Sequence, residues 1–150
     1  MAEQRDHCGE GSSVGEYCHP FCIVCGSFNE SGLGLKFEQQ SDGGVVATFP
    51  CDVHYQGYPD RLHGGVIAML LDAAMTHCLF ARRIRAVTAR LDIRYRHAVD
   101  VNAEALVRAW LEDERPPLYT LRAEVIQGKE VRAAATAKFF GDSVTEDESE

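Results

Sequence analysis

The longest apolar stretch of the chain, from Val66 to Phe80, places apolar side chains on every face of a helix. A helix at a protein surface shows an apolar stripe and a polar face, so this pattern predicts a helix surrounded by protein. Two features interrupt the pattern: the pair Gly64 and Gly65 where the helix begins, and the carboxylate of Asp72 inside the apolar part. Because burial of an unpaired carboxylate is costly, Asp72 is the first candidate for a functional residue.

Shorter segments alternate between apolar and polar positions, as half-buried strands do. They predict strands at residues 33–39 and 45–51 before the helix, and at 86–98, 103–112, 118–127 and 131–140 after it. In the first strand after the helix, alternation places Val87, Leu91 and Tyr95 on one face and Thr88 on the other. Short hairpin connections imply an antiparallel sheet. We therefore predict an α+β fold in which a curved antiparallel sheet wraps a long central helix.

The start of the predicted helix has the features of an anion site. Gly64 and Gly65 occupy the first turn, where backbone N–H groups have no helical partner and the helix dipole places partial positive charge. Glycine lets a ligand approach those groups, and an oxygen that becomes negative during a reaction would be stabilised there. Thr76 lies one turn beyond Asp72, and the amide of Gln56 lies just upstream of the glycines.

Length and charge narrow the class of protein. A chain of 150 residues with 45% hydrophobic residues is expected to form one globular domain. The net charge of −8 argues against nucleic-acid binding, and no apolar run approaches the roughly 20 residues of a membrane span. Residues 1–16 read as a mobile arm, residues 17–140 as the domain, and residues 141–150 as an acidic tail. Without a signal-peptide pattern, we expect a cytoplasmic protein with reduced cysteines.

The cysteines near the N-terminus allow more than one interpretation. The spacing of Cys18, Cys22 and Cys25 matches that of radical-SAM enzymes, but this chain is too short for the partial barrel of those enzymes. A zinc site needs four ligands, and here a single Cys-x-x-Cys pair is supplemented only by Cys18 and by His19 or Cys8. The favoured interpretation is three reduced cysteines in a packed segment, without a metal.

Three motifs together resemble those of the hotdog-fold thioesterases, in the PaaI-like and 4-hydroxybenzoyl-CoA thioesterase-like group. They are Gln56-Gly57-x5-His63-Gly64-Gly65-x6-Asp72, Cys22-x2-Cys25-Gly26-x5-Gly32-Leu33 and Val87-Thr88-Ala89-x3-Ile93-x-Tyr95. The resemblance covers residues 17–140. It implies hydrolysis of acyl-CoA thioesters by a homodimer or homotetramer, without a metal or organic cofactor.

The resemblance also implies a role for each motif residue. The catalytic carboxylate, as general base or nucleophile, falls on Asp72, and the oxyanion donor falls on the N–H of Gly64, in a turn that His63 helps to hold. The amide-bearing loop residue falls near Gln56. The hydroxyl that positions water is Thr76 in one branch of the family and Thr88 in another. Apart from the resemblance, three arginines follow the helix, where they either form a solvated basic cap that suits the helix dipole or bind CoA phosphates: Arg82, Arg83 and Arg85.

Two other functions stay open at this level. Hotdog hydratases and dehydratases act on acyl thioesters with a histidine and a carboxylate, for which His77 or His63 would be the partner of Asp72. A non-catalytic module that binds acyl-CoA is the second alternative.

The helix geometry also predicts an assembly. Gly64 and Asp72 are about 12 Å apart along one helix axis, too far to act on one thioester. We therefore expect an obligate dimer whose antiparallel helices bring the two groups together.

Overall fold

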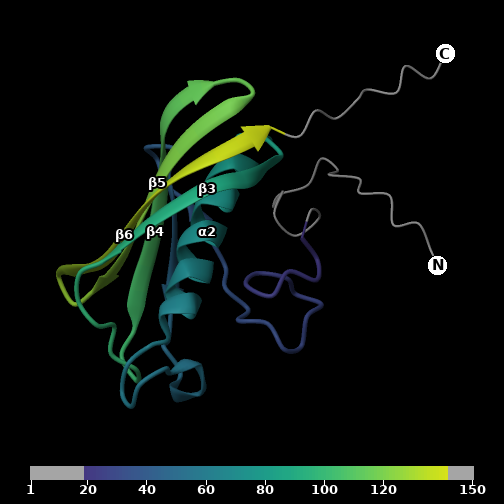
Figure 1. Ribbon diagram of the computed structural model, residues 1–150. Helices are drawn as coiled ribbons and strands as arrows, with labels where there is room; N and C mark the ends of the chain where they lie inside the picture. The colour runs from purple at the N-terminus through teal and green to yellow at the C-terminus, as the bar shows by residue number, and fades with distance from the viewer. Residues whose placement is uncertain (1–18, 142–150) are drawn as a thin grey trace.

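The computed structural model describes residues 19–141, and the predicted α+β class is confirmed. One long helix, α2 (Gly64–Phe80), lies against a six-stranded antiparallel sheet with the order β1-β2-β4-β5-β6-β3 (Figure 1). The strands are β1 (Glu38–Gln39), β2 (Val45–Phe49), β3 (Ala86–Tyr95), β4 (Ala105–Arg115), β5 (Leu118–Gln127) and β6 (Glu130–Gly141), and a short 3₁₀ helix, η1 (Val53–Tyr55), precedes α2. The predicted arm 1–16 lies outside the described residues, as do Cys8, Cys18 and residues 142–150 of the predicted tail.

Most predicted elements are found with their ends shifted by a few residues. The range of β5 agrees with the prediction, and Gly128, with φ +65°, turns the chain between β5 and β6. The predicted strand at 33–39 is wrong in its first part, since only Glu38 and Gln39 pair with β2. The backbone of Gly34 has φ +64°, and the neighbouring amide of Leu35 donates to the Val24 carbonyl, so this stretch leaves the sheet.

The helix is covered on one side, not on every side as predicted. Ten of its 17 residues are buried, and together with β4 and β5 they form the centre of the core. Most of the residues that stay half-buried or exposed recur every three or four positions and make one stripe: Gly65, Ala68, Met69, Asp72 and Thr76. We call this set the open stripe of α2. No helix in the described part of the chain is long and apolar enough to span a membrane.

Strand β3 forms a long edge of the sheet. It pairs only with β6 among the described strands, and Val87 and Tyr95 are 59% and 52% exposed. An edge strand presents unpaired backbone groups that can pair with another chain. Because side chains of β3 reach residues of α2, the edge strand and the open stripe belong to one face of the molecule.

A β-bulge in β3 corrects the predicted alternation of faces. Thr88 is paired with Phe139 and Arg90 with Lys138, so Ala89 is inserted without a partner on β6. An inserted residue reverses the in-and-out alternation of the side chains that precede it. Thr88 was predicted to lie on the face opposite Leu91, but the bulge turns it toward α2.

Candidate active site

The first turn of α2 is held by His63. This residue has an extended backbone, with φ −61° and ψ 134°, and caps the helix through its Nδ1, which accepts the Gly65 N–H at 2.8 Å. A Cβ on Gly65 would lie 3.0 Å from that Nδ1, so a side chain there would displace the ring. Because Nδ1 is the acceptor, the neutral ring carries its proton on Nε2. His63 therefore caps the turn that contains the two glycines.

The Gly64 amide is open to a ligand. Within residues 19–141 it donates no backbone or side-chain hydrogen bond, whereas the Gly64 carbonyl accepts one from Tyr95 Oη at 2.8 Å. The Tyr95 ring lies against the glycine, 3.6 Å from where a Cβ would be. Since the helix dipole places partial positive charge at this amide, the turn can stabilise a negative oxygen.

A pocket of about 610 Å³ opens beside this turn. Its walls combine apolar, aromatic and basic side chains with the helix start: Gly57, Tyr58, Arg61, Leu62, His63, Gly64, Ile67, Tyr95, Arg96, His97, Ala98 and Val99. The sequence reasoning did not find Arg61 and Arg96 as site residues. Arg61 stands two positions before His63, and this proximity to the motif is the signal that could have identified it.

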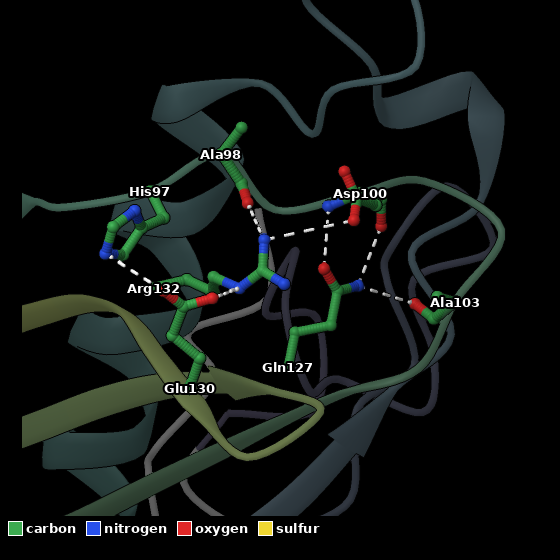
Figure 2. Close-up of polar contacts among 7 residues, drawn as sticks. All are labelled: His97, Ala98, Asp100, Ala103, Gln127, Glu130 and Arg132. Atoms are coloured by element: carbon green, nitrogen blue, oxygen red, sulfur yellow. Dashed lines mark hydrogen bonds and ion pairs between the residues drawn. The ribbon is translucent and has the colours of Figure 1, made fainter.

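Two side chains of the β5–β6 hairpin hold residues 98–103, a loop that continues from the pocket wall formed by residues 96–99 (Figure 2). The buried Gln127 amide accepts the Asp100 N–H at 2.8 Å and donates to the carbonyls of Asp100 and Ala103 at 2.8 and 3.2 Å. Arg132 donates to the Ala98 carbonyl at 2.6 Å. Arg132 thus holds the loop through the backbone of Ala98, the His97 side chain pairs with Glu130 at 3.0 Å, and both loop residues line the pocket.

The Asp72 carboxylate lies on the open stripe and is half-buried, so the expectation of a buried carboxylate is wrong for a single chain. Its Oδ1 accepts a hydrogen bond from Thr88 Oγ1 at 2.6 Å, across the space between α2 and β3. Thr76 donates instead to the backbone carbonyl of Asp72, at 3.0 Å. Of the two candidate threonines, only Thr88 has its hydroxyl bonded to the carboxylate.

The other predicted site residues do not line the pocket beside Gly64. The Gln56 side-chain oxygen accepts the Asp60 N–H at 3.2 Å within its own loop, and Gln56 does not line the pocket. Arg82, Arg83 and Arg85 follow the other end of α2, where the Arg82 guanidinium lies against Gly43. Their predicted binding of CoA phosphates stays a prediction.

His77 is packed among aromatic rings and does not face Asp72. Its ring stacks on Phe37 at 4.5 Å between centroids and meets the edge of Phe80 at 5.4 Å. Burial lowers the pKa of His77 to about 4, and the positive charge of His19 acts in the same direction. A histidine that stays neutral in an aromatic environment is a poor partner for general acid–base chemistry with Asp72.

The two halves of the candidate site are separate in one chain. Gly64 and Asp72 are eight positions apart on α2, about 12 Å along the axis, and Asp72 is not among the residues that line the pocket. A thioester carbonyl bound at Gly64 would therefore need its carboxylate from elsewhere.

The amino-acid sequence is similar to that of known thioesterases. Residues 60–134, half of the chain, match the family described as the thioesterase superfamily. Acyl-coenzyme A thioesterase THEM4 of Rattus norvegicus is 29% identical over 116 residues, which are 74% of this chain and 50% of that protein. The chain thus spans about half the length of this relative.

Solved structures share the fold. The PaaI protein of Thermus thermophilus superposes with a TM-score of 0.66 at 24% identity, covering 72% of this chain and 93% of that one. A Streptococcus mutans protein bound to acetyl-CoA superposes with a TM-score of 0.68 at 20% identity, covering 72% and 88% of the two chains. These similarities confirm the predicted hotdog fold.

Proposed function

The chain belongs to the thioesterase superfamily, and from this premise we propose that it hydrolyses an acyl-CoA thioester to the free acid and CoA. The observation that carries the proposal is the Asp72–Thr88 pair on the open face of a helix whose first amide has no acceptor within residues 19–141. A carboxylate and an unpaired amide are the two groups that thioester hydrolysis requires.

In the proposed reaction, the Gly64 N–H binds the thioester carbonyl oxygen. Asp72 takes a proton from water while the water oxygen attacks the carbonyl carbon, or its carboxylate attacks that carbon directly. Negative charge then grows on the oxygen at Gly64, so this hydrogen bond strengthens in the transition state. On the general-base route the C–S bond breaks, and the CoA sulfur takes the proton held by Asp72 and leaves as the free thiol. On the nucleophilic route the sulfur leaves as the thiolate, and a water molecule then hydrolyses the anhydride between the acyl group and Asp72, which releases the free acid and restores the carboxylate. Thr88 orients the carboxylate through the bond at 2.6 Å.

The proposed active form is a two-fold dimer. Antiparallel packing of two α2 helices along their open stripes would place Gly64 of one chain beside Asp72 of the other and cover both open faces. The exposed edge of β3 supports this assembly, because it can pair with its symmetry copy and extend the sheet. Each dimer would contain two composite sites.

Basic residues around the pocket suggest where the CoA phosphates bind. Arg61 and Arg96 line the pocket beside Gly64 and carry fixed positive charge. In an antiparallel dimer, the partner subunit's Arg82 would lie roughly 15 Å beyond Gly64 on that same side. We propose that Arg61 and Arg96 contact the phosphates, and that the predicted cluster at Arg82, Arg83 and Arg85 adds to them from the partner.

The first experiment is a thiol-release assay over a panel of short, medium and aromatic acyl-CoAs, with Asp72→Asn as the inactive reference. Release that depends on Asp72 supports the proposal. Hydration of an enoyl-CoA without thiol release would favour a hydratase, and thermal stabilisation by acyl-CoA without either reaction would favour a binding module.

The second experiment tests the shared site by complementation. Asp72→Asn and Gly64→Pro chains are unfolded together and refolded as mixed dimers. In a heterodimer one site would collect both lesions and the other would be intact, so activity should partly return. Verified heterodimers as inactive as both parents would overturn the composite site without touching the proposed reaction.

A further inference from the structure

A second group of donor atoms lies in the N-terminal segment (residues 19–37), at the end of α2 opposite the pocket. A ring nitrogen of His19 and the sulfurs of Cys22 and Cys25 lie within 4.8 Å of one another, and all three residues are half-buried. We propose that these three side chains bind a Zn²⁺ ion that crosslinks the start of the N-terminal segment, next to the end of the helix. This proposal does not depend on the thioesterase function.

The donor set suits zinc. Thiolate and imidazole are the ligands of tetrahedral zinc sites, and two cysteines separated by two residues provide one arm of such a site. Hard cations such as Mg²⁺ and Ca²⁺ prefer oxygen donors, which this cluster lacks. Three protein ligands leave the fourth position of the tetrahedron for water or another donor.

The backbone holds the cysteine pair in a compact loop. The Val24 N–H donates to Cys22 Sγ at 3.4 Å, and the Gly26 N–H donates to the Cys22 carbonyl at 2.9 Å. A Cβ on Gly26 would lie 2.3 Å from the Cys22 nitrogen, so only glycine fits. An amide that donates to a ligand sulfur orients the ligand and partly neutralises its charge, which is the outer-shell support that metal ligands receive.

The cluster lies beside the end of α2, in a segment that contains no helix or strand. The His19 ring meets the edge of Phe80, the last residue of α2, at 4.9 Å between centroids. From residue 19 to residue 37 the segment contains no helix or strand, although Val24 and Leu35 reach the core. A metal bound to both ends of the turn 19–25 would add a crosslink to a segment whose backbone hydrogen bonds lie outside any helix or strand.

A disulfide between Cys22 and Cys25 is the competing state of this cluster. Both cysteines are free thiols in this structure. A bound zinc ion would hold both sulfurs as thiolates and so exclude the disulfide.

The test uses the full chain, purified without a metal-affinity tag, treated with a chelator under reducing conditions and titrated with ZnCl₂. We expect one Zn²⁺ per chain. Titration with Co²⁺ should give the visible bands of a tetrahedral site and the ultraviolet charge-transfer band of cobalt–thiolate bonds.

Matched variants locate the site. Cys22→Ala and Cys25→Ala should lose stoichiometric binding, and His19→Gln should bind more weakly. Cys78→Ala, which removes a thiol elsewhere in the core, and His54→Gln, which removes an exposed imidazole, should bind as the wild type does. Circular dichroism checks that each variant is folded.

A measurement on the unmodified chain guards against variants that fail to fold. Zinc should slow alkylation of Cys22 and Cys25, followed residue by residue by mass spectrometry. The proposal is overturned by any of three results: no binding near one ion per chain, binding that survives in Cys25→Ala, or alkylation of the pair that zinc does not change.

Discussion

The two ends of the candidate site differ in how much of their surroundings one chain provides. At the start of α2, the amide of Gly64 is surrounded by a capped turn, by Tyr95 and by a pocket whose wall is fixed through Gln127 and Arg132. Two turns later, the carboxylate of Asp72 has Thr88 on one side and an open stripe on the other. The proposed oxyanion half has its surroundings within the chain, whereas the proposed carboxylate half would be covered only by a second chain.

The physical reason lies in what each group must do. A backbone amide needs only geometry, which local sequence can build through a cap and two glycines. A carboxylate must be partly desolvated to work as a base, and desolvation needs cover from several elements. If this comparison is right, a substitution at Gly64 should impair the site of its own chain. A substitution at Asp72 should impair the site of the partner chain in the dimer.

Replacement of the carboxylate should have the largest effect. Asp72→Asn keeps the shape of the side chain but removes the base or nucleophile, so turnover should fall at least about 100-fold. Thiol release at saturating acyl-CoA measures the effect, and thermal unfolding should show a folded variant. Asp92→Asn is the matched control on exposed β3 and should retain activity. An Asp72→Asn enzyme as fast as the wild type would remove Asp72 from the mechanism.

Removal of the Gly64 amide hydrogen should have the second-largest effect on turnover. Proline is well tolerated at the first position of a helix, and the extended backbone of His63 suits a following proline. Gly64→Pro should therefore fold and lose about 100-fold in turnover, the scale of one oxyanion donor.

Gly64→Ala is the control, because it adds a Cβ at an ordinary contact distance from Tyr95 and keeps the N–H. Equal losses in the two variants would mean that the added carbon, and not the lost hydrogen, causes the effect.

Substitution of the two threonines near Asp72 should affect turnover to different extents. Thr88→Val removes the hydroxyl that donates to the carboxylate, and turnover should fall about 10-fold, as expected for one hydrogen bond to a charged group. Thr76→Val removes a hydroxyl that donates to a helix carbonyl, and turnover should change little. The two variants are compared by turnover at saturating acyl-CoA. The reverse order would assign the water-positioning role to Thr76.

The smallest effect on turnover should come from a substitution that loosens the loop beside the pocket wall. Gln127→Ala leaves backbone groups of Asp100 and Ala103 without their partner, so the free energy of unfolding should drop by about 2 kcal/mol. Because residues 96–99 would then move, KM should rise while kcat stays close to that of the wild type. Gln40→Ala removes an exposed amide and is the control. A change in kcat larger than that in KM would place this network in the chemistry and not in binding.

The sequence by itself determined the parts that rest on local patterns. The helix at Gly64–Phe80, the β5 strand and the glycine at the β5–β6 turn follow from periodicity and from backbone preferences over a few residues. The same is true of the prominence of Asp72 in an apolar stretch, whereas the role of His63 in the first turn was implied only by the family resemblance. Each of these features depends on neighbours in the chain, so no knowledge of the tertiary structure was needed.

Only the tertiary structure decided which groups meet. The bulge at Ala89 turns Thr88 toward Asp72, although simple alternation had placed it on the other face. The placement of β3 beside β6 leaves one edge and one helix stripe open, which the all-round apolar pattern of α2 concealed. Arg61 and Arg96 join one pocket wall from distant positions. These contacts depend on register and on strand order, which are set by packing across the whole sheet and are absent from any short window of sequence.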